Sequence, residues 1–258
     1  MMTKTSSETQ GLINNDEKVV EIRNLKKSFG DVKVLRDLNL DLYDRENLVI
    51  LGRSGSGKSV LIKCMVGLLK PDSGEIDVLG YDVPSLNHKQ LDELRQQVGF
   101  SFQGSALYDS MTVRENLEFP LKRNRGIYDL DELDKLVMDA LRDVGLENAV
   151  NKTPAELSGG MKKRVGIART LILKPKIMLY DEPTAGLDPV TSGEINDLIM
   201  EVRDKYSTAS IIITHDISCA RNTSDRIIAL FGGYNKLEGT FEELKKSNDP
   251  ELREFFIY

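Results

Sequence analysis

The sequence has few of the residues on which several protein classes depend. It contains no tryptophan, two histidines and two cysteines, Cys64 and Cys219, which both lie in apolar segments with helical spacing. Two cysteines provide neither a disulfide framework nor a zinc site, so a reducing compartment is the simplest interpretation, and both thiols are expected in the core. Apolar runs of 18 residues are also absent, so the sequence predicts no membrane-spanning helix, and a membrane role would need another polypeptide.

An excess of positive charge is also missing. The chain has 35 Lys and Arg against 41 Asp and Glu, which gives a formal net charge of -6. Dedicated nucleic-acid-binding proteins usually carry a basic surplus, so we expect no nucleic-acid partner. Hydrophobic residues make up 40% of the 258 residues and charged residues 29%, which is typical of a globular chain long enough to bury a sizeable core.

The first residues differ in composition from the rest. Residues 1–17 are polar, rich in Ser, Thr and Asn, and lack the apolar centre of a signal peptide. We therefore expect a flexible leader. The remaining residues, 18–258, are expected to form a single domain.

A phosphate-binding P-loop is the most informative motif. It matches the pattern G-x-x-x-x-G-K-S and consists of Gly52, Arg53, Ser54, Gly55, Ser56, Gly57, Lys58 and Ser59. A strand-like apolar run precedes it and a helical pattern follows, as the mechanism requires. Glycines let backbone N–H groups point at a polyphosphate, and the helix start adds positive potential. Lys58 is predicted to reach the β- and γ-phosphates and Ser59 to bind Mg²⁺. The alternative is a chance Gly/Ser turn.

Polar residues also follow three other strand-like segments. Gln103 comes after residues 98–102 and is positioned to reach a metal-bound water, although it can equally be an ordinary loop residue. Asp181 and Glu182 end the run 177–182; the first can hold Mg²⁺ through water, and the second can orient water for attack on the γ-phosphate. The alternative for these two acids is a solvated turn.

His215 follows the apolar strand-like residues 210–214. A lone histidine at a strand end is more often structural than catalytic. Because ligands in open parallel sheets bind at the carboxyl ends of strands, this position favours contact with the γ-phosphate. Phe29 lies in a loop between two strand-like segments and either stacks on a purine base or only covers the sheet.

A helical region separates the strand-like segments. Apolar residues from Leu130 to Val144 follow helical spacing, so we expect a mainly helical insertion, residues 104–174, in an α/β framework. Ser158 is a good helix N-cap, and Gly159 and Gly160 expose N–H groups after it, which makes a second anion site possible. A capped helix with a flexible entry is the alternative. Asp188 is a further expected N-cap.

The combination of these motifs resembles the nucleotide-binding subunit of ABC (ATP-binding cassette) transporters from residue 19 to the C-terminus. The most specific segment is Leu157–Met161, which is similar to the family signature L-S-G-G-Q, with Met161 in place of glutamine. The other matches occur in the family's order: Phe29 as the adenine-stacking aromatic, the P-loop, Gln103 as the Q-loop, Asp181 as Walker B, Glu182 as the catalytic base, Asp188 in the D-loop and His215 as the switch histidine.

The resemblance implies a P-loop NTPase with a RecA-like core sheet, an antiparallel β-subdomain and an inserted helical signature subdomain. It also implies an Mg-ATPase that works as a sandwich of two copies, with each ATP between one P-loop and the partner's signature. Ser158, Gly159, Gly160 and Asp188 would then bind ATP, and Ser59, Gln103 and Asp181 would serve the metal. A transmembrane permease is the expected partner, which puts the chain on the cytoplasmic face of a bacterial inner membrane as a peripheral protein.

A narrower resemblance concerns the substrate. Residues 102–121, the run Ser158–Arg164 and the tail 249–256 look like the Mla/Mce-type (MlaF-like, Mkl) lipid-transport ATPases, which implies lipid transport with MCE-type and small regulatory partners. The alternatives are an ABC ATPase for another solute and a non-transport ABC ATPase. Long heptad repeats and a second P-loop are absent, which argues against the non-transport types. A nucleotide kinase or small GTPase would lack the signature.

Overall fold

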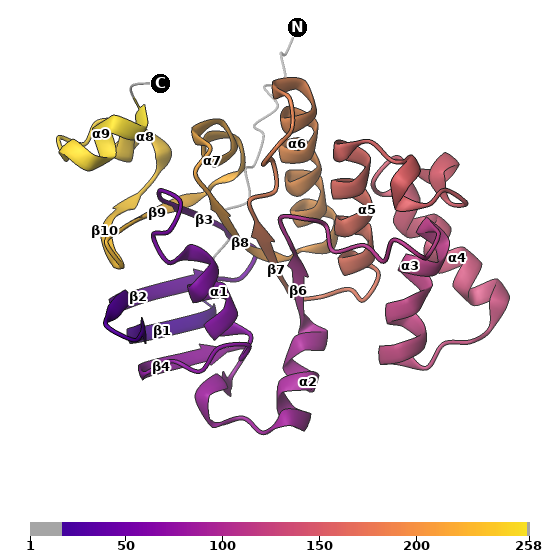
Figure 1. Cartoon of the computed structure of the whole chain (residues 1–258), viewed down its shortest axis with the longest axis horizontal. Helices are drawn as coiled ribbons and strands as arrows, with labels where there is room; N and C mark the ends of the chain where they lie inside the picture. Colours follow the sequence, from indigo (N-terminus) through magenta and orange to yellow (C-terminus); the bar gives the residue numbers. More distant parts are fainter. Residues whose placement is uncertain (1–16, 257–258) are drawn as a thin grey trace, which may run out of the picture.

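The computed structural model describes residues 17–256 (Figure 1). The predicted leader lies outside these residues except for Glu17, and residues 257 and 258 also lie outside them. Two β-sheets and the helices around them form the fold, as expected for an α/β protein with an additional antiparallel sheet. Within residues 17–256, no helix combines the length and apolarity that crossing a membrane requires.

The larger sheet has six strands in the order β10-β9-β3-β8-β7-β6. Their bounds are β3 Asn47–Leu51, β6 Val98–Ser101, β7 Ile177–Asp181, β8 Ala209–Thr214, β9 Arg226–Phe231 and β10 Tyr234–Gly239. All pairs are parallel except β10 with β9. Strands β3 and β8 are buried along their whole length, because cores cover both faces of the sheet.

The smaller sheet is antiparallel and has the order β2-β1-β4-β5. Its strands are β1 Lys18–Phe29, β2 Val32–Tyr43, β4 Ser73–Val78 and β5 Tyr81–Asp82. Leu38, Leu40 and Leu42 are buried and alternate with more exposed residues, as in a strand with one face on the core. These leucines join one core with helix α1, Lys58–Met65, on one face of the larger sheet. Cys64 is buried in that core, as predicted.

The remaining helices are α2 His88–Gln97, α3 Val113–Pro120, α4 Leu130–Arg142, α5 Gly159–Leu171, α6 Pro189–Tyr206, α7 Ile217–Thr223, α8 Phe241–Lys245 and α9 Pro250–Phe256. Helix α2 joins the first core through Leu94, and the others form a second core on the other face of the sheet. Figure 1 shows α3, α4 and α5 side by side, away from the antiparallel sheet. Ser158 and Asp188 cap α5 and α6 as predicted. Leu130 was expected on the apolar face of α4 but is 77% exposed, because it is the first residue of that helix.

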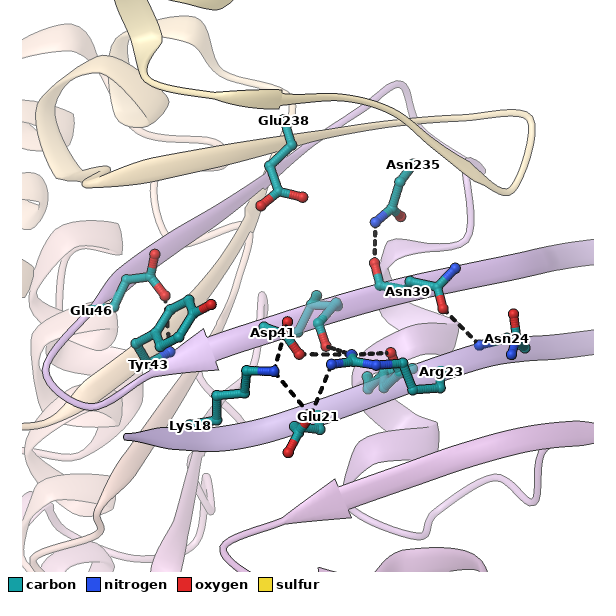
Figure 2. A network of polar contacts seen from close by, with 12 residues as sticks. Lys18, Glu21, Arg23, Asn24, Asn39, Asp41, Tyr43, Glu46, Asn235 and Glu238 are labelled. Carbon is teal, nitrogen blue, oxygen red and sulfur yellow. Dashed lines mark hydrogen bonds and ion pairs between the residues drawn. The ribbon is translucent and has the colours of Figure 1, made fainter. Parts of the chain in front are cut away.

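A network of ion pairs lies on the antiparallel sheet (Figure 2). On the antiparallel sheet, Asp41 of β2 pairs with Arg23 at 2.7 Å and Lys18 at 3.3 Å. Arg226 of β9 donates to Glu46 at 2.7 and 2.9 Å and to the Asp41 carbonyl at 2.6 Å. It therefore joins the parallel sheet to the end of β2.

Candidate active site

The carboxyl ends of four neighbouring parallel strands meet at one edge of the larger sheet. Gly52 follows β3, His215 follows β8, Asp181 ends β7 and Gln103 comes two residues after β6. Sequentially distant residues therefore line one cavity of about 420 Å³. The predicted site residues in its lining are Phe29, Ser54, Gly55, Gly57, Lys58, Ser59, Gln103, Asp181, Glu182 and His215.

The P-loop backbone leaves no room for larger residues at two of its glycines. A Cβ at Gly52 would lie 2.5 Å from the Leu230 carbonyl oxygen, which is well inside van der Waals contact. Gly57 has φ +102°, a conformation that residues with a side chain rarely adopt, and it directly precedes helix α1. The Ser56 hydroxyl is buried without a hydrogen-bond partner. This cradle fits a polyphosphate, which can accept bonds from the loop N–H groups.

Lys58 connects the P-loop with the acidic strand end. Its Nζ donates to the carbonyl oxygens of Gly52 at 2.6 Å and Arg53 at 3.1 Å and lies 3.5 Å from Glu182 Oε1. The other Glu182 oxygen lies 2.9 Å from His215 Nδ1. Burial lowers the pKa of Lys58, and the neighbouring Glu182 opposes this shift. One carboxylate therefore links the lysine and the histidine that the sequence predicted for phosphate binding.

Asp181 is suited to hold a cation. Its Oδ1 is buried without a hydrogen-bond partner, and burial together with the adjacent Glu182 raises its pKa. A bound cation would give the Oδ1 atom a partner and would favour the charged form of the carboxylate. Within residues 17–256, no group of three His, Cys, Asp or Glu could hold a metal alone. The arrangement fits Mg²⁺, which typically takes one or two protein ligands and completes its shell with phosphate oxygens and water.

The aromatic side of the cavity comes from the antiparallel sheet. Phe29 is 48% exposed and has the Lys27 ammonium 5.4 Å from its ring centroid. Val34 and Val60 line the same cavity beside it, and the sequence analysis did not identify them. No local signal in the sequence could have identified them, because isolated valines are ordinary core residues. Phe29 is therefore available to stack on a flat ring, as one of its two predicted roles requires.

The signature lies away from the cavity that the P-loop lines. Ser158 Oγ accepts a bond from the Met161 N–H at 3.3 Å, as an N-cap does. A Cβ at Gly159 would lie 3.3 Å from Leu187, and one at Gly160 would lie 2.4 Å from Thr191. The fold therefore packs the signature against the segment around Asp188, and none of Ser158, Gly159, Gly160 and Asp188 lines the cavity.

Lys163 is a third residue that the sequence analysis missed. It lies on α5 and is buried, and its Nζ donates to the carbonyl oxygens of Gln103 and Glu182. A signal was present, because a lysine stands among the small and apolar residues Gly160, Gly166 and Ile167 at helical spacing. A charged residue on the buried face of a helix is unusual and favours a specific contact.

Comparisons with known proteins agree with this geometry. Residues 35–185 match the sequence profile of the ABC transporter family. The chain is 39% identical over 236 residues to the "Probable ribonucleotide transport ATP-binding protein mkl" of Mycobacterium leprae, which covers 92% of the chain and 68% of that protein. It is 36% identical over 263 residues to "Protein TRIGALACTOSYLDIACYLGLYCEROL 3, chloroplastic" of Arabidopsis thaliana, covering 95% of the chain and 75% of the plant protein.

A solved structure with the same fold is the ATP-binding cassette MJ0796, described as a dimer in a post-hydrolysis state bound to ADP and Pi. It has a TM-score of 0.79 and 34% sequence identity, and the match covers 86% of this chain and 98% of the cassette. The predicted P-loop NTPase fold is thereby confirmed. The chain belongs to the ABC transporter family, as an ATP-binding subunit that hydrolyses ATP.

Proposed function

We propose that the chain hydrolyses Mg-ATP between two copies arranged head to tail and thereby drives lipid transport in a bacterial envelope. The observation that carries the catalytic part is the set of contacts at the strand ends, where Glu182 lies 3.5 Å from Lys58 Nζ and 2.9 Å from His215 Nδ1. Each of these three side chains can act on the γ-phosphate or on the attacking water.

The roles of the residues follow from their positions. Lys58 binds the β- and γ-phosphates once it exchanges its bonds to Gly52 and Arg53 for bonds to phosphate oxygens. Glu182 orients the attacking water and accepts its proton, and His215 contacts the γ-phosphate. Ser59, Gln103 and Asp181 hold Mg²⁺ directly or through water. The cation neutralises charge on the phosphate oxygens.

The dimer accounts for the position of the signature. Ser158, Gly159 and Gly160 do not line the cavity of their own chain, although the start of α5 offers free N–H groups to an anion. A second copy would bring its signature to the phosphate bound by the first, with Asp188 beside it. The dimeric state of the related cassette MJ0796 supports this arrangement.

An apolar groove supports a membrane partner. It has a volume of about 340 Å³ and includes Phe102, Tyr108 and Phe119 in its lining. Tyr108 is 44% exposed and belongs to the segment 102–121, which resembles the Mla/Mce-type ATPases. We infer that a helix of a permease binds here, with its apolar side in the groove. The groove lies between the end of β6 and the helical insertion, 104–174, so the permease would touch the segment that carries Gln103. Such a partner would hold the chain at the cytoplasmic face of the inner membrane.

The lipid substrate is the finer part of the proposal. It rests on the Mla/Mce-like segments of the sequence and on the plant relative, whose name includes the name of a lipid. MCE-type and small regulatory subunits would complete such a transporter. The mycobacterial relative carries a different name, for ribonucleotide transport, so transport of another solute is the second candidate.

The test uses the complex that co-purifies with the chain from its native membrane. Reconstituted into vesicles with fluorescent phospholipid, it is expected to move lipid between donor and acceptor vesicles only with Mg-ATP. A matched complex with Glu182→Gln should bind ATP and move no lipid. ATP hydrolysis that rises with a ribonucleotide, and not with phospholipid, would favour the second candidate and contradict the lipid proposal.

A further inference from the structure

Lys163 connects the signature helix with two parts of the candidate active site. Its side chain leaves α5 near the start of the helix, five residues after Ser158, and is 7% exposed. Its Nζ donates to the Gln103 carbonyl oxygen at 2.6 Å and to the Glu182 carbonyl oxygen at 3.1 Å. One ammonium group therefore fixes the backbone of the Gln103 turn and that of Glu182 relative to one helix.

A contribution to fold stability does not explain why a lysine is buried at this position. Burying an ammonium group costs free energy unless an opposite charge compensates for it. Burial lowers the pKa of Lys163, and the charges of Asp181 and Glu182 raise it by less, so they compensate only part of the cost. Among residues 17–256, no ion pair involves Lys163, and its hydrogen bonds are to two neutral carbonyl groups. An apolar side chain of similar length, such as methionine, would fill the space without that cost. The position therefore favours a role that needs two strong hydrogen-bond donors at one point.

The backbone is strained at Glu182 and in the turn that follows Gln103. Glu182 has φ +48°, and Ser105 and Ala106, two and three residues after Gln103, have φ +60° and +47°. A left-handed conformation costs such residues about 1 kcal/mol or more each, so surrounding contacts must hold it. Strained residues of this kind concentrate at functional sites.

Helix α5 supplies three of those contacts. Besides the bonds of Lys163, Arg169 Nη1 donates to the Ala106 carbonyl oxygen at 2.7 Å. Between them, a Cβ at Gly166 would lie 3.2 Å from Ser105, so the glycine lets the turn pack closely against the helix. A shift of α5 would therefore shift the Gln103 turn, and through Lys163 it would also shift Glu182.

We propose that Lys163 is a positioning residue for ATP hydrolysis, which holds Gln103 and Glu182 in register with the signature helix. The proposal rests on the roles proposed above for Gln103 and Glu182. Lys163 acts through these two residues and does not touch ATP. Its removal should therefore slow the chemical step and leave nucleotide binding largely intact.

The experiment compares Lys163→Met, Lys163→Gln and Lys163→Arg in the full chain. A displacement of catalytic groups by about 1 Å can cost about 100-fold in rate, so Lys163→Met is expected to lower kcat by about that factor. The KM for ATP should change little. The Gln and Arg variants keep at least two N–H donors and should recover a large part of kcat. Lys135→Met, which removes an exposed lysine from α4, is the matched control.

The outcomes separate positioning from a structural role. An unchanged kcat in Lys163→Met would overturn the proposal, as would a loss confined to KM or one that Gln and Arg do not recover. Thermal unfolding shows whether each variant folds. If Lys163→Met does not fold, the changes in kcat and in KM are measured with Lys163→Gln instead. In a Glu182→Gln background, adding Lys163→Met should lower the residual rate by a smaller factor than in the parent, because only the part that acts through Gln103 remains. If the Glu182→Gln variant by itself retains hydrolysis, the role proposed above for Glu182 is wrong, and this result does not depend on the Lys163 variants.

Discussion

Contacts hold both the backbone and the side chain of Glu182. Its backbone is left-handed, its N–H donates to the Ile213 carbonyl at 2.9 Å, and its carboxylate lies between Lys58 and His215. Because contacts on every side fix this residue, its carboxylate has a defined direction into the cavity. This is the property that a general base needs, since proton transfer depends on geometry first.

Replacing Glu182 with glutamine tests this role. The amide keeps the size of the side chain and cannot accept the proton of the attacking water, so hydrolysis should fall by about 100-fold or more. ATP binding should persist, and size-exclusion chromatography with Mg-ATP should show a stable dimer. Glu201→Gln, at an exposed position of α6, is the control and should behave like the parent. Hydrolysis near the parent rate would remove Glu182 from its proposed role.

At the scale of elements, the capping box of α3 shows how the helical region is held. Thr112 Oγ1 accepts from the Glu115 N–H at 3.2 Å, and Glu115 Oε2 accepts from the Thr112 N–H at 2.7 Å. These reciprocal bonds satisfy two N–H groups that a helix start otherwise leaves free. Phe119 of the apolar groove lies on this helix, so the cap also supports the proposed permease surface.

We expect Thr112→Ala to lower the free energy of unfolding by about 1 kcal/mol, which urea denaturation can measure. The pKa of Glu115 is lowered chiefly by the bond from the Thr112 N–H. A lowered pKa in the folded state stabilises the protein above the ordinary value of 4.5, and this contribution is lost as the pH falls through the lower folded value. Thr112→Ala keeps this N–H bond and removes the second one, in which the Thr112 hydroxyl donates to Glu115 Oε2 at 3.0 Å. The Thr112→Ala effect should therefore be larger at pH 7 than at a pH below the lowered folded pKa of Glu115. Equal effects at both pH values would show that the bond between the hydroxyl and the carboxylate contributes nothing.

The whole molecule depends on the junction between its two sheets. Arg226 extends from β9 to Glu46 and to the Asp41 carbonyl of the antiparallel sheet, where the ion pairs of Lys18 and Arg23 continue the network (Figure 2). The Glu46 side chain is only 7% exposed, so its charge depends on this partner. Phe29 comes from one sheet and Lys58 follows the other, so this junction also affects the two sides of the cavity.

Arg226→Met should destabilise the fold by about 3 kcal/mol, because it leaves the Glu46 charge buried without its partner. The double variant Arg226→Met with Glu46→Gln should recover part of that loss, since no unpaired charge remains. Urea denaturation of the parent, both single variants and the double variant measures the coupling. If the double variant is no more stable than Arg226→Met alone, the buried charge is not the cause.

The sequence by itself determined the chemistry of the site. The P-loop can be recognised from eight consecutive residues. The positions of the other polar residues follow from the apolar runs before them, because parallel strands end at one edge of a sheet. Lys58, Gln103, Asp181, Glu182 and His215 could therefore be predicted to come together, and they line one cavity. The N-caps at Ser158 and Asp188 were equally predictable, because capping depends on neighbouring residues.

Only the tertiary structure decided which residues meet across long separations. Strand order puts β8 between β3 and β7, so the strand ends that lead to the P-loop, His215 and Glu182 are neighbours, although His215 is far from both in the sequence. The packing of the helices directs the Lys163 side chain to two carbonyl groups. It also leaves Leu130 exposed, although this residue follows the helical spacing of the apolar residues. Periodicity states which face of a helix is apolar, but what that face packs against depends on how the elements are arranged in space.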